Sequence, residues 1–116
     1  MSWLEAASLD PALVTIGSHT LSHPILSSLS EVEQHTEIVE SKRLLEQRLH
    51  REIDFFCYPN GDFDVRSDLT VRRHYAAAFS SQAAALCAES DPYVLPRIHA
   101  GQSQELFVRR LYRHSA

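Results

Sequence analysis

Short apolar, β-favouring runs alternate with helical segments along this 116-residue chain, and this alternation constrains the fold more than any other feature. Strands are predicted at residues 13–16, 53–58, 76–79 and 93–98, because each is an apolar or aromatic run bounded by turn-forming residues. Strands that alternate with helices are typical of βα units around a parallel sheet. The sequence therefore predicts an α/β fold with about four strands, in a single domain over residues 1–116.

Capping boxes predict where the first two helices begin. Ser2 and Ser30 are each followed three residues later by a glutamate, Glu5 and Glu33, and this pairing satisfies backbone amides at a helix start. After the second box, apolar residues recur with helical spacing over residues 32–49, which predicts a long amphipathic helix. The remaining helices are predicted at residues 65–74 and 104–112, with a small unassigned one at 82–86.

The charge pattern and the cysteines exclude several classes of protein. Residues 1–64 hold eleven acidic and four basic side chains, whereas residues 65–116 hold four acidic and seven basic ones. The basic residues are not clustered with aromatic ones, so no nucleic-acid partner is predicted. No apolar run approaches about 18 residues, so no membrane span is predicted. The first basic residue is Lys42, and Cys57 and Cys87 form no Cys-x-x-Cys pair, so the chain as written is expected in the cytoplasm with reduced thiols.

The loop after the first predicted strand contains two histidines, His19 and His23, with Pro24 directly after the second. Two neutral imidazoles at this spacing can converge on one divalent cation. Pro24 disfavours helical dihedrals at His23, and Thr20 and Ser22 lie where they can position the ligands. The alternative is that both histidines are ordinary surface residues, and from the residues alone the two interpretations are equally supported.

The loop after the second predicted strand, residues 55–62 (FFCYPNGD), combines aromatic and turn-forming residues. Pro59 and Gly61 can hold backbone N–H groups in a fixed open turn, which is the arrangement that suits an oxyanion site. The simpler alternative is a plain strand end, where the aromatic residues form core or groove wall and Cys57 is a small buried hydrophobe.

The last predicted strand leads into Arg97 and His99. The Arg97 guanidinium can fix a carboxylate or a substrate oxygen, and His99 can supply the proton that a leaving amine needs. On a strand the two side chains share one face, so both point into a site or neither does. A solvent-facing pair is equally compatible with the sequence.

Four blocks occur in one order, at residues 16–24 (IGSHTLSHP), 37–42 (EIVESK), 56–61 (FCYPNG) and 95–98 (LPRI). With these blocks the chain resembles the polysaccharide deacetylase family, the NodB-homology domain, over nearly its whole length. The resemblance implies a distorted (β/α) barrel, here a partial one of about four βα units. It also implies a metal-dependent hydrolase that removes N- or O-acetyl groups from chitin-like sugars, peptidoglycan or biofilm polysaccharides, so the implied partner is an acetylated carbohydrate polymer or oligomer.

The resemblance assigns roles to residues of the first two loops. His19 and His23 match the family's two metal-binding histidines, and the implied cofactor is a divalent metal, with zinc as the first choice. Tyr58, Pro59 and Asn60 match the turn that lines the substrate groove. Asn60 replaces the usual aromatic residue there but keeps the backbone N–H that binds the oxyanion.

The resemblance also assigns catalytic roles in the third loop. Many members have an arginine where this chain has Cys57, and Arg97 is expected to take over its role of orienting a carboxylate. His99 is the nearest candidate for the general acid.

One family block has no counterpart, since no Asp-Asp pair occurs in the chain. In the family a Thr-Phe-Asp-Asp-Gly block contributes the catalytic base and the third metal ligand, and a hydrolytic zinc site needs three protein ligands and an open position. Asp62 and Asp64 are the available substitutes, although their loop belongs to the opposite wall. A complete eight-unit barrel takes about 250 residues, so residues 1–116 are expected to form the C-terminal part of a truncated deacetylase domain.

Two functions follow as expectations. The first is a metal-dependent deacetylase-like hydrolase that acts on carbon–nitrogen bonds of acetylated carbohydrate. The second is a catalytically inactive remnant that retains a metal-binding or carbohydrate-binding groove, or that assembles with a partner chain. A partial barrel exposes sheet edges, so self-association or a completing partner is expected, and a full-length form could be exported.

Overall fold

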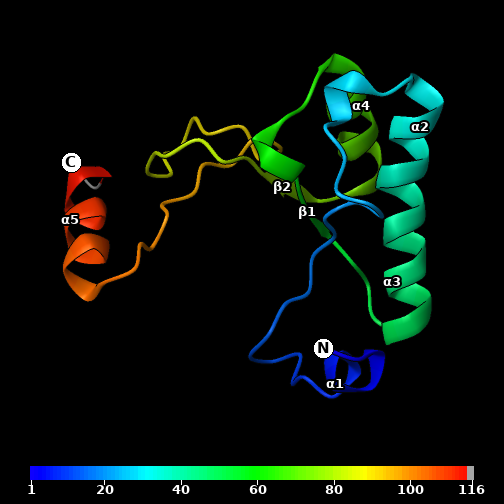
Figure 1. Cartoon of the computed structure of the whole chain (residues 1–116), viewed down its shortest axis with the longest axis horizontal. Helices are drawn as coiled ribbons and strands as arrows, with labels where there is room; N and C mark the ends of the chain where they lie inside the picture. Colours follow the sequence, from blue (N-terminus) through cyan, green and yellow to red (C-terminus); the bar gives the residue numbers. More distant parts are fainter. Residues whose placement is uncertain (115–116) are drawn as a thin grey trace.

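The computed structural model describes residues 1–114 and shows a helical body packed on a small parallel sheet, with an N-terminal arm and a C-terminal arm that extend from it (Figure 1). The elements in chain order are α1 (Trp3–Ala7), the 3₁₀ turn η1 (Leu26–Ser28), α2 (Glu31–His35), the π-helical segment η2 (Thr36–Glu40), α3 (Ser41–Leu49), β1 (Phe55–Cys57), the 3₁₀ turn η3 (Pro59–Gly61), α4 (Val65–His74), β2 (Ala77–Phe79) and α5 (Gln104–His114).

The sheet is parallel, as the alternation predicts. Strands β1 and β2 pair with Phe55 opposite Ala77, and single parallel bridges extend the sheet on both sides, from Ser18 to Phe56 and from Leu95 to Phe79. The segments that contain Ser18 and Leu95 therefore occupy the outer positions of a four-membered arrangement without forming full strands.

The two predicted outer strands are wrong in extent, for different reasons. Residues 13–16 precede the bridge at Ser18, and the amides of Leu13 and Val14 donate to the Asp10 carbonyl in a turn instead of pairing with a neighbour. Leu13 is accordingly 83% exposed. In residues 93–98, Pro96 has no N–H to continue the ladder after Leu95.

The predicted helix starts are confirmed. Ser2 accepts a hydrogen bond from the Glu5 amide and Ser30 accepts one from the Glu33 amide, and each glutamate side chain returns to the capping serine's amide. Helix α4 begins after a third capping residue, Asp64, and spans the predicted residues.

The buried face of the long helix differs from the predicted apolar stripe. Val32 is 76% exposed, whereas the polar residues Gln34 and Ser41 are buried with Ile38 and Leu49. These four positions follow each other at helical spacing on the side that faces the sheet and α4. Buried polar side chains need hydrogen-bond partners. The Gln34 side-chain amide donates to the Leu26 carbonyl at 2.8 Å, and the Ser41 hydroxyl lies 2.7 Å from the Ser18 hydroxyl.

The core lies between the sheet and the helices α2, α3 and α4. Phe56 and Ala78 point from the sheet into this core, while their neighbours Phe55, Cys57 and Phe79 point to the other face and are only half-buried. The fully assembled core consists of Leu26, Ile38, Leu49, Ile53, Phe56, Tyr58, Val71, Tyr75 and Ala78.

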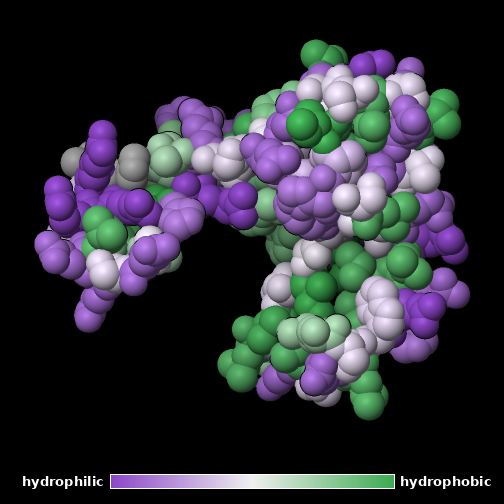
Figure 2. Space-filling view, in the orientation of Figure 1, coloured by the Kyte–Doolittle hydropathy of each residue, from purple (hydrophilic) through white to green (hydrophobic). Residues whose placement is uncertain are grey.

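The C-terminal helix α5 forms as predicted but lies apart from the body, at the end of an extended segment (Figure 1). Residues 82–86, the small unassigned helix, have no regular structure. The apolar side chains Leu106, Phe107 and Leu111 of α5 remain about two-fifths exposed, and a second apolar surface gathers over α1 at the opposite arm (Figure 2). Across residues 1–114, no helix combines the length and apolarity that crossing a membrane requires.

Candidate metal and substrate site

The first predicted ligand, His19, is anchored to the sheet. Its neighbour Ser18 donates its amide to the Phe55 carbonyl at 2.8 Å and accepts the Cys57 amide at 2.9 Å. The His19 Nδ1 lies 2.7 Å from the Cys57 carbonyl oxygen. Because a carbonyl only accepts, Nδ1 must carry the proton, and this leaves the lone pair on Nε2. Histidines that bind metals typically donate the N–H of the other ring nitrogen to a carbonyl or carboxylate in this way.

The second predicted ligand, His23, lies beside the first. The two imidazole rings have centroids 4.8 Å apart and meet edge to face at 73°. Thr20 and His23 both have left-handed backbones, with φ of 69° and 59°, and the Thr20 hydroxyl accepts the His23 amide at 3.0 Å. The loop therefore folds back on itself and brings together the two histidines that the spacing predicts as a pair.

A carboxylate from the long helix holds the tip of this loop. Glu37, in the π-helical segment η2, accepts the amides of Leu21 at 2.8 Å and Ser22 at 3.0 Å, and also accepts the Ser22 hydroxyl at 2.5 Å. The sequence motif containing Glu37 marks the family resemblance, but sequence reasoning assigned this residue no role. Its partners lie 15 and 16 residues away, so no local pattern links them.

A cavity of about 340 Å³ opens between the histidine loop and the outer face of the sheet. His19 is among the residues that line it, and the half-buried face of β1 and β2 forms its wall. The lining consists of Thr15, Gly17, Ser18, His19, Phe55, Phe56, Cys57 and Phe79. The wall is mainly apolar and aromatic, which is the surface chemistry expected of a small-ligand site.

The predicted oxyanion turn is present, but its residues differ in accessibility. Asn60 is exposed and left-handed, with φ 55°, and Gly61 follows with φ 67°. Pro59 is buried, and Tyr58 is 0% exposed, so the prediction that the Tyr58 ring lines an open groove is wrong in this structure. Its ring packs against Phe56 with centroids 5.3 Å apart. Burial raises the pKa of the Tyr58 phenol above its usual range.

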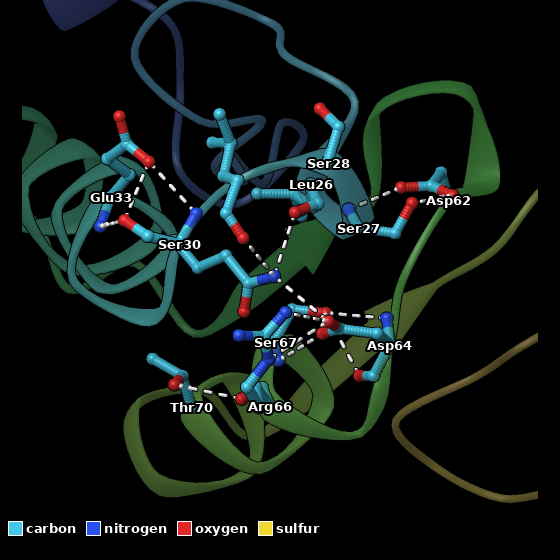
Figure 3. Close-up of polar contacts among 12 residues, drawn as sticks. Leu26, Ser27, Ser28, Ser30, Glu33, Asp62, Asp64, Arg66, Ser67 and Thr70 are labelled. Atoms are coloured by element: carbon cyan, nitrogen blue, oxygen red, sulfur yellow. Dashed lines mark hydrogen bonds and ion pairs between the residues drawn. The ribbon is translucent and has the colours of Figure 1, made fainter.

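Asp62, one of the two carboxylates considered as a substitute metal ligand, is already engaged. Its oxygens accept the Ser27 amide at 2.8 Å and the Ser27 hydroxyl at 2.9 Å, which ties the oxyanion turn to the end of the histidine loop (Figure 3). Both oxygens therefore serve a structural contact between the two loops.

Asp64, the other candidate carboxylate, caps helix α4. It accepts the Ser67 amide at 2.9 Å and the side-chain amide of buried Gln34 at 3.1 Å, and it pairs with Arg66 at 3.0 Å (Figure 3). The Ser67 amide, together with Gln34 and Arg66, holds the pKa of Asp64 well below its usual range. Among residues 1–114 no group of three His, Cys, Asp or Glu side chains is arranged to hold a metal ion.

The third predicted pair, Arg97 and His99, lines a separate cavity of about 220 Å³ with Ser81 and Ile98. Arg97 donates through Nε to the Ser80 carbonyl at 2.8 Å. Ser81 also donates to the Asn60 carbonyl at 3.3 Å, so this cavity adjoins the oxyanion turn. The predicted pair is thus brought together at one cavity, although its segment is not a regular strand.

The His99 ring is oriented by helix α5. Its Nδ1 accepts the Gly101 amide at 3.0 Å and lies 2.8 Å from an Arg110 guanidinium nitrogen, which can only donate. Nδ1 therefore carries no proton, and the ring proton is on Nε2. In this neutral form His99 can donate a hydrogen bond from Nε2, and it can act as an acid only after Nδ1 leaves these two donors and is protonated.

The geometry defines a class of protein. It is an α/β fragment in which two histidines lie side by side on the loop after the first strand position of a parallel sheet. The sequence profile described as "Polysaccharide deacetylase" matches residues 3–78, so the chain belongs to the polysaccharide deacetylase family. A curated relative, YxkH of Bacillus subtilis (strain 168), assigned by its name to the polysaccharide deacetylases, is 24% identical over 86 residues. These residues cover 73% of this chain and 31% of the relative.

Solved structures share the fold. The Streptococcus pyogenes deacetylase PplD, in complex with acetate, superimposes with a TM-score of 0.72 at 25% identity, over 81% of this chain and 43% of PplD. BC0361, a polysaccharide deacetylase from Bacillus cereus, gives 0.78 at 19% identity, over 96% of this chain and 36% of BC0361. BA3943 from Bacillus anthracis, a CE4 family pseudoenzyme, gives 0.58 at 14%, over 84% of this chain and 31% of that protein.

These similarities confirm the predicted α/β fold of the NodB type as a partial barrel. The chain spans less than half the length of each of these relatives. One of the relatives with the same fold is named as a pseudoenzyme, so the fold alone does not decide catalytic activity.

Proposed function

We propose that this chain carries the metal-binding and oxyanion-binding part of a polysaccharide deacetylase site that acts on acetyl groups of carbohydrate. The observation that carries the proposal is the anchored His19, whose Nδ1–H is bonded to the Cys57 carbonyl at 2.7 Å while the ring of His23 lies 4.8 Å away, centroid to centroid. Two neutral imidazoles fit zinc or a similar divalent ion, which needs at least one further ligand.

Each residue has a distinct task in this proposal. His19 and His23 hold the metal, which when bound supplies Lewis-acid polarisation of the acetyl carbonyl and activation of water. The exposed left-handed turn at Asn60 presents its backbone N–H to the oxyanion. Arg97, at the adjoining cavity, orients a carboxylate. His99 serves as the general acid once its Nδ1 has left the Gly101 amide and Arg110 and has taken up a proton, so that the imidazolium protonates the leaving amine and returns to neutral imidazole.

A second function, binding without turnover, is favoured by a specific observation. Within residues 1–114 no carboxylate joins the two histidines, and the oxygens of Asp62 and Asp64 are used elsewhere. Hydrolysis needs a base and a third ligand, so without them the site would bind metal or acetylated carbohydrate and turn over slowly if at all.

The two functions are separated by measuring acetate release from an N-acetylglucosamine oligomer with added zinc or cobalt. Release that depends on the protein and the metal supports the hydrolase, whereas no release at high protein concentration leaves the binding function. Metal content tests the site itself: His19→Ala should lose the ion, and His99→Ala, in the separate cavity, should keep it. Equal content in wild type and His19→Ala would remove the ligand assignment.

We also propose self-association of this chain through its uncovered sheet. The half-buried face of Phe55, Cys57 and Phe79 borders the cavity of about 340 Å³, and the outer bridges at Ser18 and Leu95 each leave a sheet edge. Sedimentation velocity over a range of concentrations should show a rising average mass. A single monomeric species at every concentration would contradict this part of the proposal.

A further inference from the structure

We infer that Glu37 is the positioning residue of the histidine loop, because it holds His23 in the geometry that makes a pair with His19. The inference rests on the proposed metal site, but the contacts that carry it are present in the chain by themselves. Glu37 accepts three hydrogen bonds from two consecutive loop residues, the amides of Leu21 and Ser22 and the Ser22 hydroxyl.

The loop needs this support because two of its residues have unfavourable backbones. Thr20, which is β-branched, has φ 69°, and His23 has φ 59°. A left-handed backbone at a residue other than glycine costs on the order of 1 kcal/mol and persists only where the surroundings fix it. Glu37 binds the two residues that lie between these strained positions. Glu37 therefore holds the loop at the point where the two left-handed residues would otherwise return to a more favourable backbone conformation.

The position of Glu37 in the helix explains how it reaches the loop. It lies in the first turn of the π-helical segment η2, between α2 and α3, and the π geometry widens the helix at this point. Ile38, its neighbour, is fully buried in the core. Burial of Ile38 therefore fixes the helix backbone at this point. The Glu37 side chain extends from it to the loop, where its three hydrogen bonds hold the carboxylate.

The test compares Glu37→Ala with Glu40→Ala and Glu37→Gln. Glu40 lies in the same π-helical segment but pairs with Arg43 at 2.7 Å and has no bond to the loop, so it is the matched control. Glutamine keeps one acceptor oxygen for the two amides and should restore most of the geometry. Three readouts are used: amide hydrogen exchange at Leu21 and Ser22, the ring-to-ring NOE between His19 and His23, and zinc affinity by calorimetry.

In the metal-free protein, Glu37→Ala should accelerate exchange at the Leu21 and Ser22 amides at least about tenfold and remove the ring NOE, as expected when an amide loses its only acceptor. The Cys57 amide, bonded to Ser18, serves as an internal reference and should not change. Zinc affinity should fall about 10- to 100-fold, the range known for residues that orient metal ligands, because Glu37 positions His23 through Leu21 and Ser22. Glu37→Gln should recover most of each change, and Glu40→Ala should match wild type.

The outcomes separate this inference from the proposed function. Unchanged exchange and NOE in Glu37→Ala would overturn the positioning role. Faster exchange with undiminished zinc affinity would also overturn it, because the loop geometry would then be irrelevant to binding. If wild type binds no zinc while exchange and NOE respond as described, the positioning role stands and the metal site falls. Acceleration at Cys57 as well would show general destabilisation and contradict a local role.

Discussion

The two sides of the candidate site are built differently. The histidine loop, residues 18–29, donates hydrogen bonds to the Cys57 carbonyl, the Glu37 carboxylate and the Asp62 carboxylate, which lie on three separate parts of the body. The arginine segment, residues 95–101, is bonded through Leu95 to β2, through Arg97 to the Ser80 carbonyl, and through His99 to Arg110 of α5.

The difference shows which half of the site is fixed by the folding of the body itself. The partners of the histidine loop lie on elements whose other side is in the core, so its geometry follows from folding of the body. The partner of His99 lies on α5, which stands apart from the body in Figure 1. The placement of a proton donor at His99 thus depends on an element that this chain's core does not hold.

The largest expected effect is at a left-handed glycine of the oxyanion turn, residues 59–61, which Asp62 ties to the histidine loop. Gly61, on the oxyanion turn, has φ 67°, and a Cβ added there would lie 2.0 Å from the Ser81 hydroxyl and 2.8 Å from the Ser81 amide nitrogen. Gly61→Ala should therefore destabilise the fold by about 3 kcal/mol, combining backbone strain with displacement of Ser81. Urea unfolding followed by circular dichroism measures the loss.

The matched control for this change is Gly101→Ala, in the arginine segment. Gly101 has φ 83°, but its nearest neighbours would be the Arg110 guanidinium and the Leu106 Cβ, both at 3.2 Å. The long Arg110 side chain can move, so the loss should be about 1 kcal/mol, mainly from the backbone. Equal losses at the two glycines would mean that the oxyanion turn and the arginine segment are equally fixed.

A smaller effect is expected from removing the contact between the two loops. Asp62→Ala deletes both hydrogen bonds to Ser27 and should cost about 1 kcal/mol, because the contact is near the surface. Arg110→Ala, which removes the bonds to His99, should cost less than about 0.5 kcal/mol. The same unfolding assay applies to both variants. A larger loss in Arg110→Ala would show that α5 contributes to the stability of the body.

A separate expected effect is a change in acid stability. The pKa of Asp64 is held well below its usual range by the Ser67 amide, so its charged form stabilises the fold above about pH 4, the unfolded value, and this contribution is lost as pH falls below it. In Asp64→Asn the free energy of unfolding should therefore fall less steeply than in wild type as the pH drops below about 4. Urea midpoints at several pH values measure this.

Asp91→Asn is the comparison for the acid effect. The Arg72 side chain lowers the pKa of Asp91, but this ion pair is exposed, with 43% of the Asp91 side chain accessible. Solvent screens exposed pairs, so the acid limb of Asp91→Asn should stay close to that of wild type. If the free energy of unfolding depended less on pH in Asp91→Asn than in Asp64→Asn, Asp91 and not Asp64 would be the carboxylate that contributes most to acid unfolding.

Sequence patterns predicted the elements whose signals are local. The capping serines Ser2 and Ser30 and the turn at Pro59 act within three or four residues, so both helix starts and the end of β1 lie where the patterns place them. The pairing of His19 with His23 was likewise predictable, since four positions on one loop separate them. The family blocks carry the remaining fold prediction, and three of the four lie within residues 3–78, which the family profile matches.

The wrong predictions have causes that lie far away in the chain. Residues 13–16 are apolar enough for a strand, but the bridge forms at Ser18, where the Phe55 carbonyl and the Cys57 amide are available. The turn sequence that follows Tyr58 predicts a groove residue at this position, yet packing against Phe56 buries the Tyr58 side chain fully. No pattern within either segment contains these partners.

By itself, the sequence determined the α/β alternation, the helix starts and the identity of the paired histidines, because each depends on residues a few positions apart. Only the tertiary structure decided how the histidines are held, through Glu37 and Asp62, and that Asp62 and Asp64 are occupied in structural contacts. The physical reason is that hydrogen-bond partners are chosen by distance in space. The bonds between Glu37 and Ser22, and between Asp62 and Ser27, span 15 and 35 residues and exist only once the helix and the two loops have packed together.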